Sequence, residues 1–171
     1  MKYYGNLSLR LVAALLILIF YKIFYFIFIP LTLWLSYFTL KIFYNPVIQE
    51  SSIFIEGKQL IFVPACAALS AYILLALLIL FTKNIEFKKG VKLFFIGGLL
   101  ILIMNLIRID LLIIVLIEKG VNYFETLHLF FWKIVSSIYV ALVWIFLVYK
   151  FKIKEIPVYS DAKALIRMLL S

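Results

Sequence analysis

Four long apolar segments separated by short polar stretches dominate the pattern of this chain. They run over about residues 11–44, 65–81, 93–117 and 129–149. A helix needs about 20 apolar residues to cross the hydrocarbon core of a bilayer, and the second segment, though short, is sufficient. We therefore predict an all-α fold, a polytopic transmembrane helical bundle with about four spans.

The first segment is long for a single span. Its apolar core from Leu11 to Leu40 would measure about 45 Å as a helix, and it contains Lys22 and Pro30. No Gly or Asn near its middle offers a turn, so we expect one tilted helix kinked near Pro30 rather than two spans. The segment also exceeds the apolar core of a cleavable signal peptide, which is about 7–15 residues.

A β-prone stretch follows the first segment. Asn45-Pro46 ends the helix, and two pieces, 53–55 and 60–63, flank the turn Glu56-Gly57-Lys58. This pattern predicts a small β-hairpin before the second span. Because lipid does not satisfy open strand edges, the hairpin should lie outside the hydrocarbon, on the extracytoplasmic side.

The third segment is interrupted by Arg108 and Asp110. Either one long span continues to Ile117 with Arg108 in its outer half, or a span ends near Arg108 and an interfacial segment follows. The sequence leaves both arrangements open.

Charge then sets the orientation. Two thirds of the residues are apolar, the mean hydropathy is +1.19 and the net charge is +9, but the basic residues gather beside the apolar segments, which argues against nucleic-acid binding. One side holds Lys2, Arg10, the lysines of 83–92, Lys150, Lys152 and Lys154; the other holds Lys58, Lys119, Glu50, Glu56, Glu118 and Glu125. Since basic loops stay inside, both termini should be cytoplasmic in a multi-pass plasma-membrane protein.

This reading gives one membrane-embedded domain, residues 1–154, and a cytoplasmic tail, residues 155–171. Within the tail, Ala162–Leu170 has the pattern of a short amphipathic helix on the membrane surface.

Three rare reactive residues fall toward the outer face on three different spans. Pro64 suits the first turn of a helix, which places Cys66 in that turn, where the helix dipole favours the thiolate. A lone Cys between alanines is more often a small packing residue. With one Cys and one His, no zinc-ligand spacing is present, and we expect no metal or cofactor.

Arg108 and His128 complete the set. A guanidinium within a span costs about 2.5–3.5 kcal/mol on insertion scales, so Arg108 needs either a structural partner such as Asp110 or a functional role, stabilising an oxyanion or binding a substrate carboxylate. His128 should open the fourth span, as an ordinary interfacial residue or as a general base for Cys66 that Glu125 orients.

At these residues the chain resembles the exosortase/archaeosortase family of membrane-embedded cysteine transpeptidases. The similarity spans roughly residues 55 to 149 and consists of a β-prone segment running into Ala65-Cys66, the stretch Asn105-Leu106-Ile107-Arg108-Ile109, and His128 at the head of a late span. The chain departs from the family's pattern after Cys66, where Ala67-Ala68 replace Ser-Gly, and after His128, where the frequent glycine is missing.

The resemblance implies a catalytic set of Cys66 as nucleophile, Arg108 as oxyanion or substrate stabiliser and His128 as general base and acid. Its substrates would be secreted proteins with a C-terminal sorting-signal helix, cleaved on the outer face and passed to an acceptor such as a membrane lipid. The alternative from the residues alone is a non-enzymatic assembly or transporter subunit in which Arg108 pairs with Asp110.

Overall fold

The computed structural model describes residues 2–63, 66–155 and 157, with side chains described from Ser8 onward. It is mostly helical, and three helical stretches are long and apolar enough to cross a membrane. They are α2 (Tyr21–Leu40), α4 (Phe87–Lys119), and the continuous stretch of α5 (Val121–Phe130), the π-helical η1 (Phe131–Val135) and α6 (Ser136–Lys150). Two helices, α1 (Lys2–Ile19) and α3 (Leu69–Leu80), have shorter apolar lengths. The predicted tail helix lies outside the described residues.

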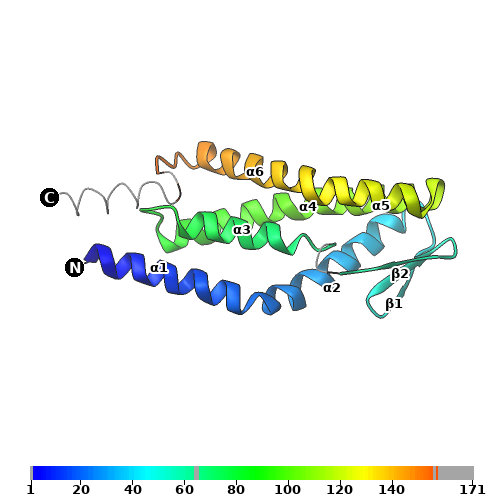
Figure 1. The fold of residues 1–171 in the computed structure, drawn as a ribbon, viewed down its shortest axis with the longest axis horizontal. Helices are drawn as coiled ribbons and strands as arrows, with labels where there is room; N and C mark the ends of the chain where they lie inside the picture. Colours follow the sequence, from blue (N-terminus) through cyan, green and yellow to red (C-terminus); the bar gives the residue numbers. More distant parts are fainter. Residues whose placement is uncertain (1, 64–65, 156, 158–171) are drawn as a thin grey trace.

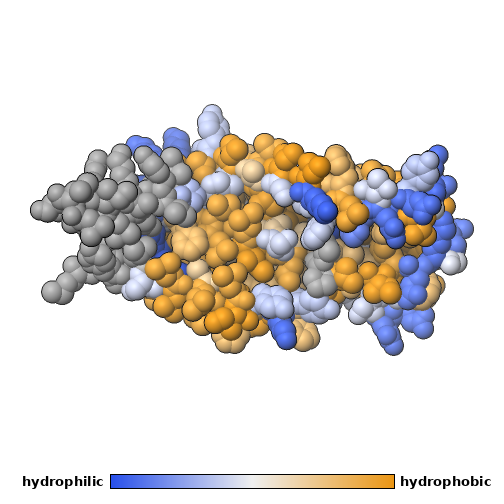
Figure 2. Space-filling view, viewed as in Figure 1, coloured by the Kyte–Doolittle hydropathy of each residue, from blue (hydrophilic) through white to orange (hydrophobic). Residues whose placement is uncertain are grey.

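The helices lie lengthwise beside one another (Figure 1). The start of α1, the α3–α4 connection and the end of α6 lie at one end, and the sheet and the turn from α4 to α5 lie at the other. Apolar side chains cover the middle of the face shown in Figure 2, and hydrophilic ones gather at the sheet end. This distribution is typical of a membrane protein, while the assignment of either end to the cytoplasm stays a prediction.

The first predicted span is divided at Phe20, not at Pro30. Pro30 lies inside α2, whereas at Phe20 the carbonyl accepts a hydrogen bond from the Ile23 N–H at 3.0 Å, a tighter spacing than in an α-helix. The axes of α1 and α2 change direction around this point (Figure 1). Nothing in the sequence around Phe20 explains why the helix is divided there.

The predicted hairpin is present and is extended by a third strand. Strands β1 (Val47–Gln49), β2 (Ser52–Ile55) and β3 (Lys58–Ile61) form an antiparallel sheet in the order β1-β2-β3. Glu56 and Gly57 form the β2–β3 turn with φ of 50° and 72°, as the two-residue type I′ connection requires. Strand β3 therefore begins at Lys58, two residues earlier than predicted.

The second predicted span is shorter than expected, and the third is continuous. Ala68 adopts a left-handed φ of 51°, which delays the start of α3 to Leu69, and its 12 residues reach only about 18 Å. In contrast, α4 runs unbroken through Arg108 to Lys119, so no break separates residues 109–117 from the rest of the third segment. Gly120 alone separates α4 from α5.

Two buried clusters pack on either side of α4. The sheet-side cluster joins α2, the sheet and the C-terminal half of α4; it comprises Ile29, Leu33, Leu40, Ile53, Ile55, Phe62, Cys66, Ala67, Ile109 and Ile113. The helix-side cluster joins α3, α4 and α6; it comprises Ala71, Tyr72, Leu75, Ile79, Leu93, Ile101, Val140, Val143, Trp144 and Leu147. Residues 105–108 of α4 lie between the α4 members of the two clusters.

Candidate functional site

Cys66 lies in the turn that precedes α3, not in the helix itself. It is 8 % exposed and belongs to the sheet-side cluster. Its N–H donates to the Val63 carbonyl at 2.8 Å, which fixes the turn directly after the sheet. The expected placement in the first turn of a helix is therefore wrong, because α3 begins at Leu69.

Burial also changes the chemistry expected of the thiol. Burial raises the pKa of the Cys66 thiol, and a backbone hydrogen bond with Val63 and the charge of Arg108 lower it by smaller amounts. The net direction is upward, so the resting side chain is a thiol rather than the thiolate that a helix N-terminus would favour.

Two side chains of α4 hold the backbone carbonyl of Cys66. Asn105 Nδ2 donates to this oxygen at 2.7 Å, and Arg108 Nη2 donates to it at 3.2 Å. Both side chains are 4 % exposed. Because Asn105 and Arg108 are three residues apart, they lie on one face of the helix and together fix the turn that carries the thiol.

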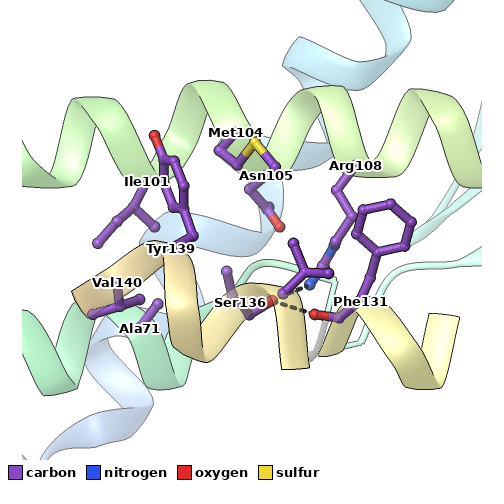
Figure 3. Close-up of a pocket in the computed structure, with 11 residues that line it drawn as sticks. Ala71, Ile101, Met104, Asn105, Arg108, Phe131, Ser136, Tyr139 and Val140 are labelled. Carbon is purple, nitrogen blue, oxygen red and sulfur yellow. Dashed lines mark hydrogen bonds between the residues drawn. The ribbon is translucent and has the colours of Figure 1, made fainter. Parts of the chain in front are cut away.

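Ser136 contacts the same guanidinium from the fourth helical segment. Arg108 Nη1 donates to Ser136 Oγ at 3.5 Å, and Ser136 Oγ donates to the Phe131 carbonyl, five residues earlier, at 2.9 Å. Figure 3 shows Ser136 between Arg108 and Phe131, with both interactions drawn. The five-residue separation matches the widened turn of η1, which places Ser136 against α4.

His128 lies within α5 rather than at the head of a span. Its ring stacks on Phe124, one turn earlier, with the ring centroids 5.6 Å apart. Nε2 is buried and has no hydrogen-bond partner among residues 2–63, 66–155 and 157. The charge of Arg108 acts on both His128 and Cys66, so the guanidinium lies within electrostatic reach of the two other predicted site residues.

Asp110 takes a different partner from the one considered in the sequence. Its carboxylate accepts a hydrogen bond from Thr39 Oγ1 on α2 at 3.1 Å. Arg108, two residues away on α4, instead donates to Cys66 and Ser136. Asp110 thus ties α2 to α4, and the guanidinium faces the turn at Cys66.

A small cavity of about 30 Å³ lies beside Arg108 (Figure 3). Its walls come from α3, α4 and the η1–α6 region. The polar lining groups are Asn105, Arg108, Ser136 and Tyr139, and Cys66 is not among its lining residues. The space therefore adjoins the residues that hold the Cys66 carbonyl, and Cys66 itself does not line it.

Sequence reasoning identified Cys66, Arg108 and His128 but gave no role to Asn105 or Ser136. Asn105 carried a usable signal, because an amide three residues before an arginine within a span shares its helix face. Ser136 carried none, since its position depends on the widened turn of η1. Among the described residues no group of three His, Cys, Asp or Glu side chains could hold a metal ion.

Comparisons with protein-family models, with curated proteins and with solved structures find no match to this chain.

Proposed function

We propose that this chain is a membrane-embedded cysteine transpeptidase, similar to exosortases and archaeosortases, that cleaves C-terminal sorting signals of secreted proteins. The observation that carries the proposal is the guanidinium of Arg108 on α4, which donates to the Cys66 backbone in the turn before α3 and to Ser136 of α6. Arg108 holds the Cys66 carbonyl at 3.2 Å, and its charge acts on both Cys66 and His128. A buried arginine that holds the turn bearing a thiol and whose charge acts on an imidazole supports transfer chemistry at this point.

The proposed reaction has two covalent steps. The Cys66 sulfur attacks the peptide carbonyl carbon while His128 takes the thiol proton, and Arg108 stabilises the oxyanion. The C–N bond then breaks, and His128 returns the proton to the leaving amine. An amine acceptor, such as that of a membrane lipid, attacks the thioester, forms a new amide and releases the thiol.

The buried thiol sets a condition on this reaction. Cys66 is 8 % exposed beneath the sheet-side cluster, so a substrate reaches the sulfur only after part of that cover moves. The cover includes β2 and the residue after β3, elements of a sheet whose strands are three or four residues long. Short strands with few ladder bonds are the part of the molecule most easily displaced.

Replacing the thiol tests the proposal. Cys66→Ala removes the sulfur but keeps the backbone carbonyl that Asn105 and Arg108 hold, so the variant should insert and fold normally. Co-expressed with a secreted protein whose C-terminus carries an apolar helix and a basic cluster, it should leave that protein unprocessed, as followed by mass on immunoblots. Arg108→Lys should also fail, because an ammonium lacks the guanidinium fork.

A serine substitution near the site serves as a control for the loss of processing. Ser137→Ala removes an exposed hydroxyl from α6, next to Ser136, and should leave processing unchanged. Normal processing by Cys66→Ala would contradict the proposal.

A second candidate is a non-enzymatic subunit of a membrane assembly or a small transporter. The observation that favours it is that the thiol is buried while the Arg108 and Asn105 donors are directed at a backbone carbonyl, which is how a purely structural tie would look. Loss of processing in Cys66→Ala with normal insertion would exclude it.

A further inference from the structure

The antiparallel sheet has one edge that is protected against further pairing and one that is open. β1 is only three residues long and follows Pro46, and both features discourage an additional strand on that side. Within the described ranges, β3 has a neighbouring strand on one side only, and it contains no proline and no bulge. Its one lysine, Lys58, donates to carbonyls of α4 instead of guarding the edge. The β3 edge therefore lacks the usual barriers to pairing with another chain.

The register identifies the main-chain groups that this edge presents. The Phe62 N–H donates to the Ser51 carbonyl at 2.8 Å, and hydrogen-bonded pairs alternate along an antiparallel ladder. Leu60 consequently bonds to β2, whereas the N–H and C=O groups of Gln59 and Ile61 point away from it. In the part of the chain that the structure describes, neither of these N–H groups donates to another backbone carbonyl. Both residues have exposed side chains, and Ile61 is 59 % exposed.

The open edge ends at the Cys66 thiol. Cys66 Sγ lies 3.9 Å from the carbonyl oxygen of Ile61, which is one of the acceptors that point away from β2. A contact of this length to sulfur is weak, so the N–H of a peptide would be a better donor to the same oxygen. The last main-chain acceptor of the edge and the sulfur therefore adjoin one another.

We propose that β3 binds the extended part of the sorting signal as an added parallel strand. The inference rests on the proposed function for the identity of this peptide. A sorting signal runs from its secreted domain toward its membrane helix, and β3 runs from the turn at Glu56-Gly57, on the predicted outer side, toward Cys66 and α3. The two chains therefore have the same direction, which is the condition for parallel pairing.

Parallel pairing also selects the bond that is cleaved. In a parallel pair, the N–H and the carbonyl of one edge residue bond to the two residues on either side of the one opposite. The Ile61 carbonyl then accepts the N–H of one peptide bond, and the carbonyl carbon of that bond lies beside Cys66 Sγ. The amide held by Ile61 is the one that the sulfur attacks, and its nitrogen stays on the Ile61 carbonyl as the C–N bond breaks.

Hydrogen exchange tests the edge without knowledge of the signal sequence, because main-chain pairing tolerates many sequences. The full chain in detergent micelles is followed by ¹⁵N NMR alone, with acetyl-Thr-Val-Thr-Val-N-methylamide, and with the same peptide N-methylated throughout, which has no N–H to donate. Without peptide, the Gln59 and Ile61 amides should exchange at least about tenfold faster than the Leu60 amide, which bonds to β2. The first peptide should slow both amides about tenfold, and the N-methylated peptide should leave them unchanged.

Two results of this experiment would overturn the proposal. Slow exchange of Gln59 and Ile61 before any peptide is added would mean that the edge is already covered. If that protection falls on dilution, a second copy of the chain covers it. Unchanged exchange at the highest peptide concentration would mean that β3 does not accept a strand.

A proline on the edge tests the link to processing. Ile61→Pro removes an N–H that points away from β2, so the ladder within the sheet is kept. Ile61→Ala is the matched control, because it loses the same side chain and keeps the N–H. Ile61→Pro should process the sorting signal at least about tenfold more slowly than Ile61→Ala, since the added strand loses a hydrogen bond. Protection of the Leu60 and Phe62 amides verifies that the sheet is intact in both variants.

These measurements separate this inference from the proposed function. If Cys66→Ala processes normally while the peptide still protects Gln59 and Ile61, the transpeptidase proposal fails and β3 remains a peptide-binding edge. If Cys66→Ala abolishes processing but Ile61→Pro processes like Ile61→Ala, the transpeptidase proposal stands and the edge is not its substrate site.

Discussion

The two clusters that flank α4 differ in what they contain and in how they are built. The buried residues of the helix-side cluster come from α3, α4 and α6, and Phe28 of α2 packs against them, with its ring stacked on Tyr72 at a centroid distance of 4.0 Å. The sheet-side cluster is closed on one side by strands of three or four residues, and it holds the only cysteine. The comparison indicates that the helix-side cluster maintains the bundle, whereas the sheet-side cluster, which covers the thiol, opens more easily.

The largest expected loss of stability comes from a substitution in the helix-side cluster. Tyr72→Ala removes a fully buried ring from the helix-side cluster and should lower the free energy of unfolding by about 3–5 kcal/mol. Tyr72→Phe is the control: the Tyr72 hydroxyl is buried without a hydrogen-bond partner among the described residues, so its removal should leave stability equal or higher. Thermal unfolding in detergent measures both, and a large loss in Tyr72→Phe would contradict this account.

A smaller loss of stability is expected on the sheet side, with a distinct effect on the thiol. Ile53 of β2 is 1 % exposed and packs in the same cluster as Cys66, so Ile53→Ala should cost about 2–5 kcal/mol and loosen the cover. Alkylation of Cys66 by N-ethylmaleimide under native conditions should then be at least about tenfold faster, a factor that corresponds to about 1.4 kcal/mol of easier opening.

The equivalent change in the other cluster sharpens the comparison. Ile101 is 2 % exposed in the helix-side cluster, and Ile101→Ala should cost a similar free energy without accelerating the alkylation of Cys66. Equal acceleration in both variants would mean that the two halves open together.

The smallest effect should come from the tie between the sheet and α4. Lys58 Nζ donates to the Leu116 carbonyl and, at 2.9 Å, to the Ile117 carbonyl, near the C-terminal end of α4. Lys58→Met keeps the aliphatic stem but loses these bonds, and it should cost about 1–2 kcal/mol. Hydrogen exchange in the last turn of α4 should become faster, while Lys119→Met, which removes an exposed lysine from the same turn, should change it little.

The sequence predicts the parts of this fold that local chemistry decides. The β2–β3 turn follows from Gly57, which takes positive φ without strain, and a helical third segment follows from its long apolar run, whereas the sequence left open whether that helix continues through Arg108. It does not predict β1, because three residues after Asn45-Pro46 show no period, or the late start of α3, because nothing marks Ala68 as left-handed.

The sequence predicts which reactive residues belong to the site, but not the hydrogen bonds that fix their positions. Cys66 and Arg108 stand out because a thiol and a guanidinium are rare in apolar segments. That Arg108 and Asn105 donate to the backbone of Cys66 rather than to its sulfur depends on the turn before α3, which only the tertiary structure shows.

Gly120 has a mechanical consequence for the whole bundle. With φ of 86° and ψ of −179°, a conformation essentially restricted to glycine, it joins α4 to α5 with no intervening loop. Two long helices linked by a single residue cannot slide past each other by a full helical turn, because the connection is too short. Any widening between them must be a pivot about Gly120, small beside the hinge and greater toward the far end of the pair.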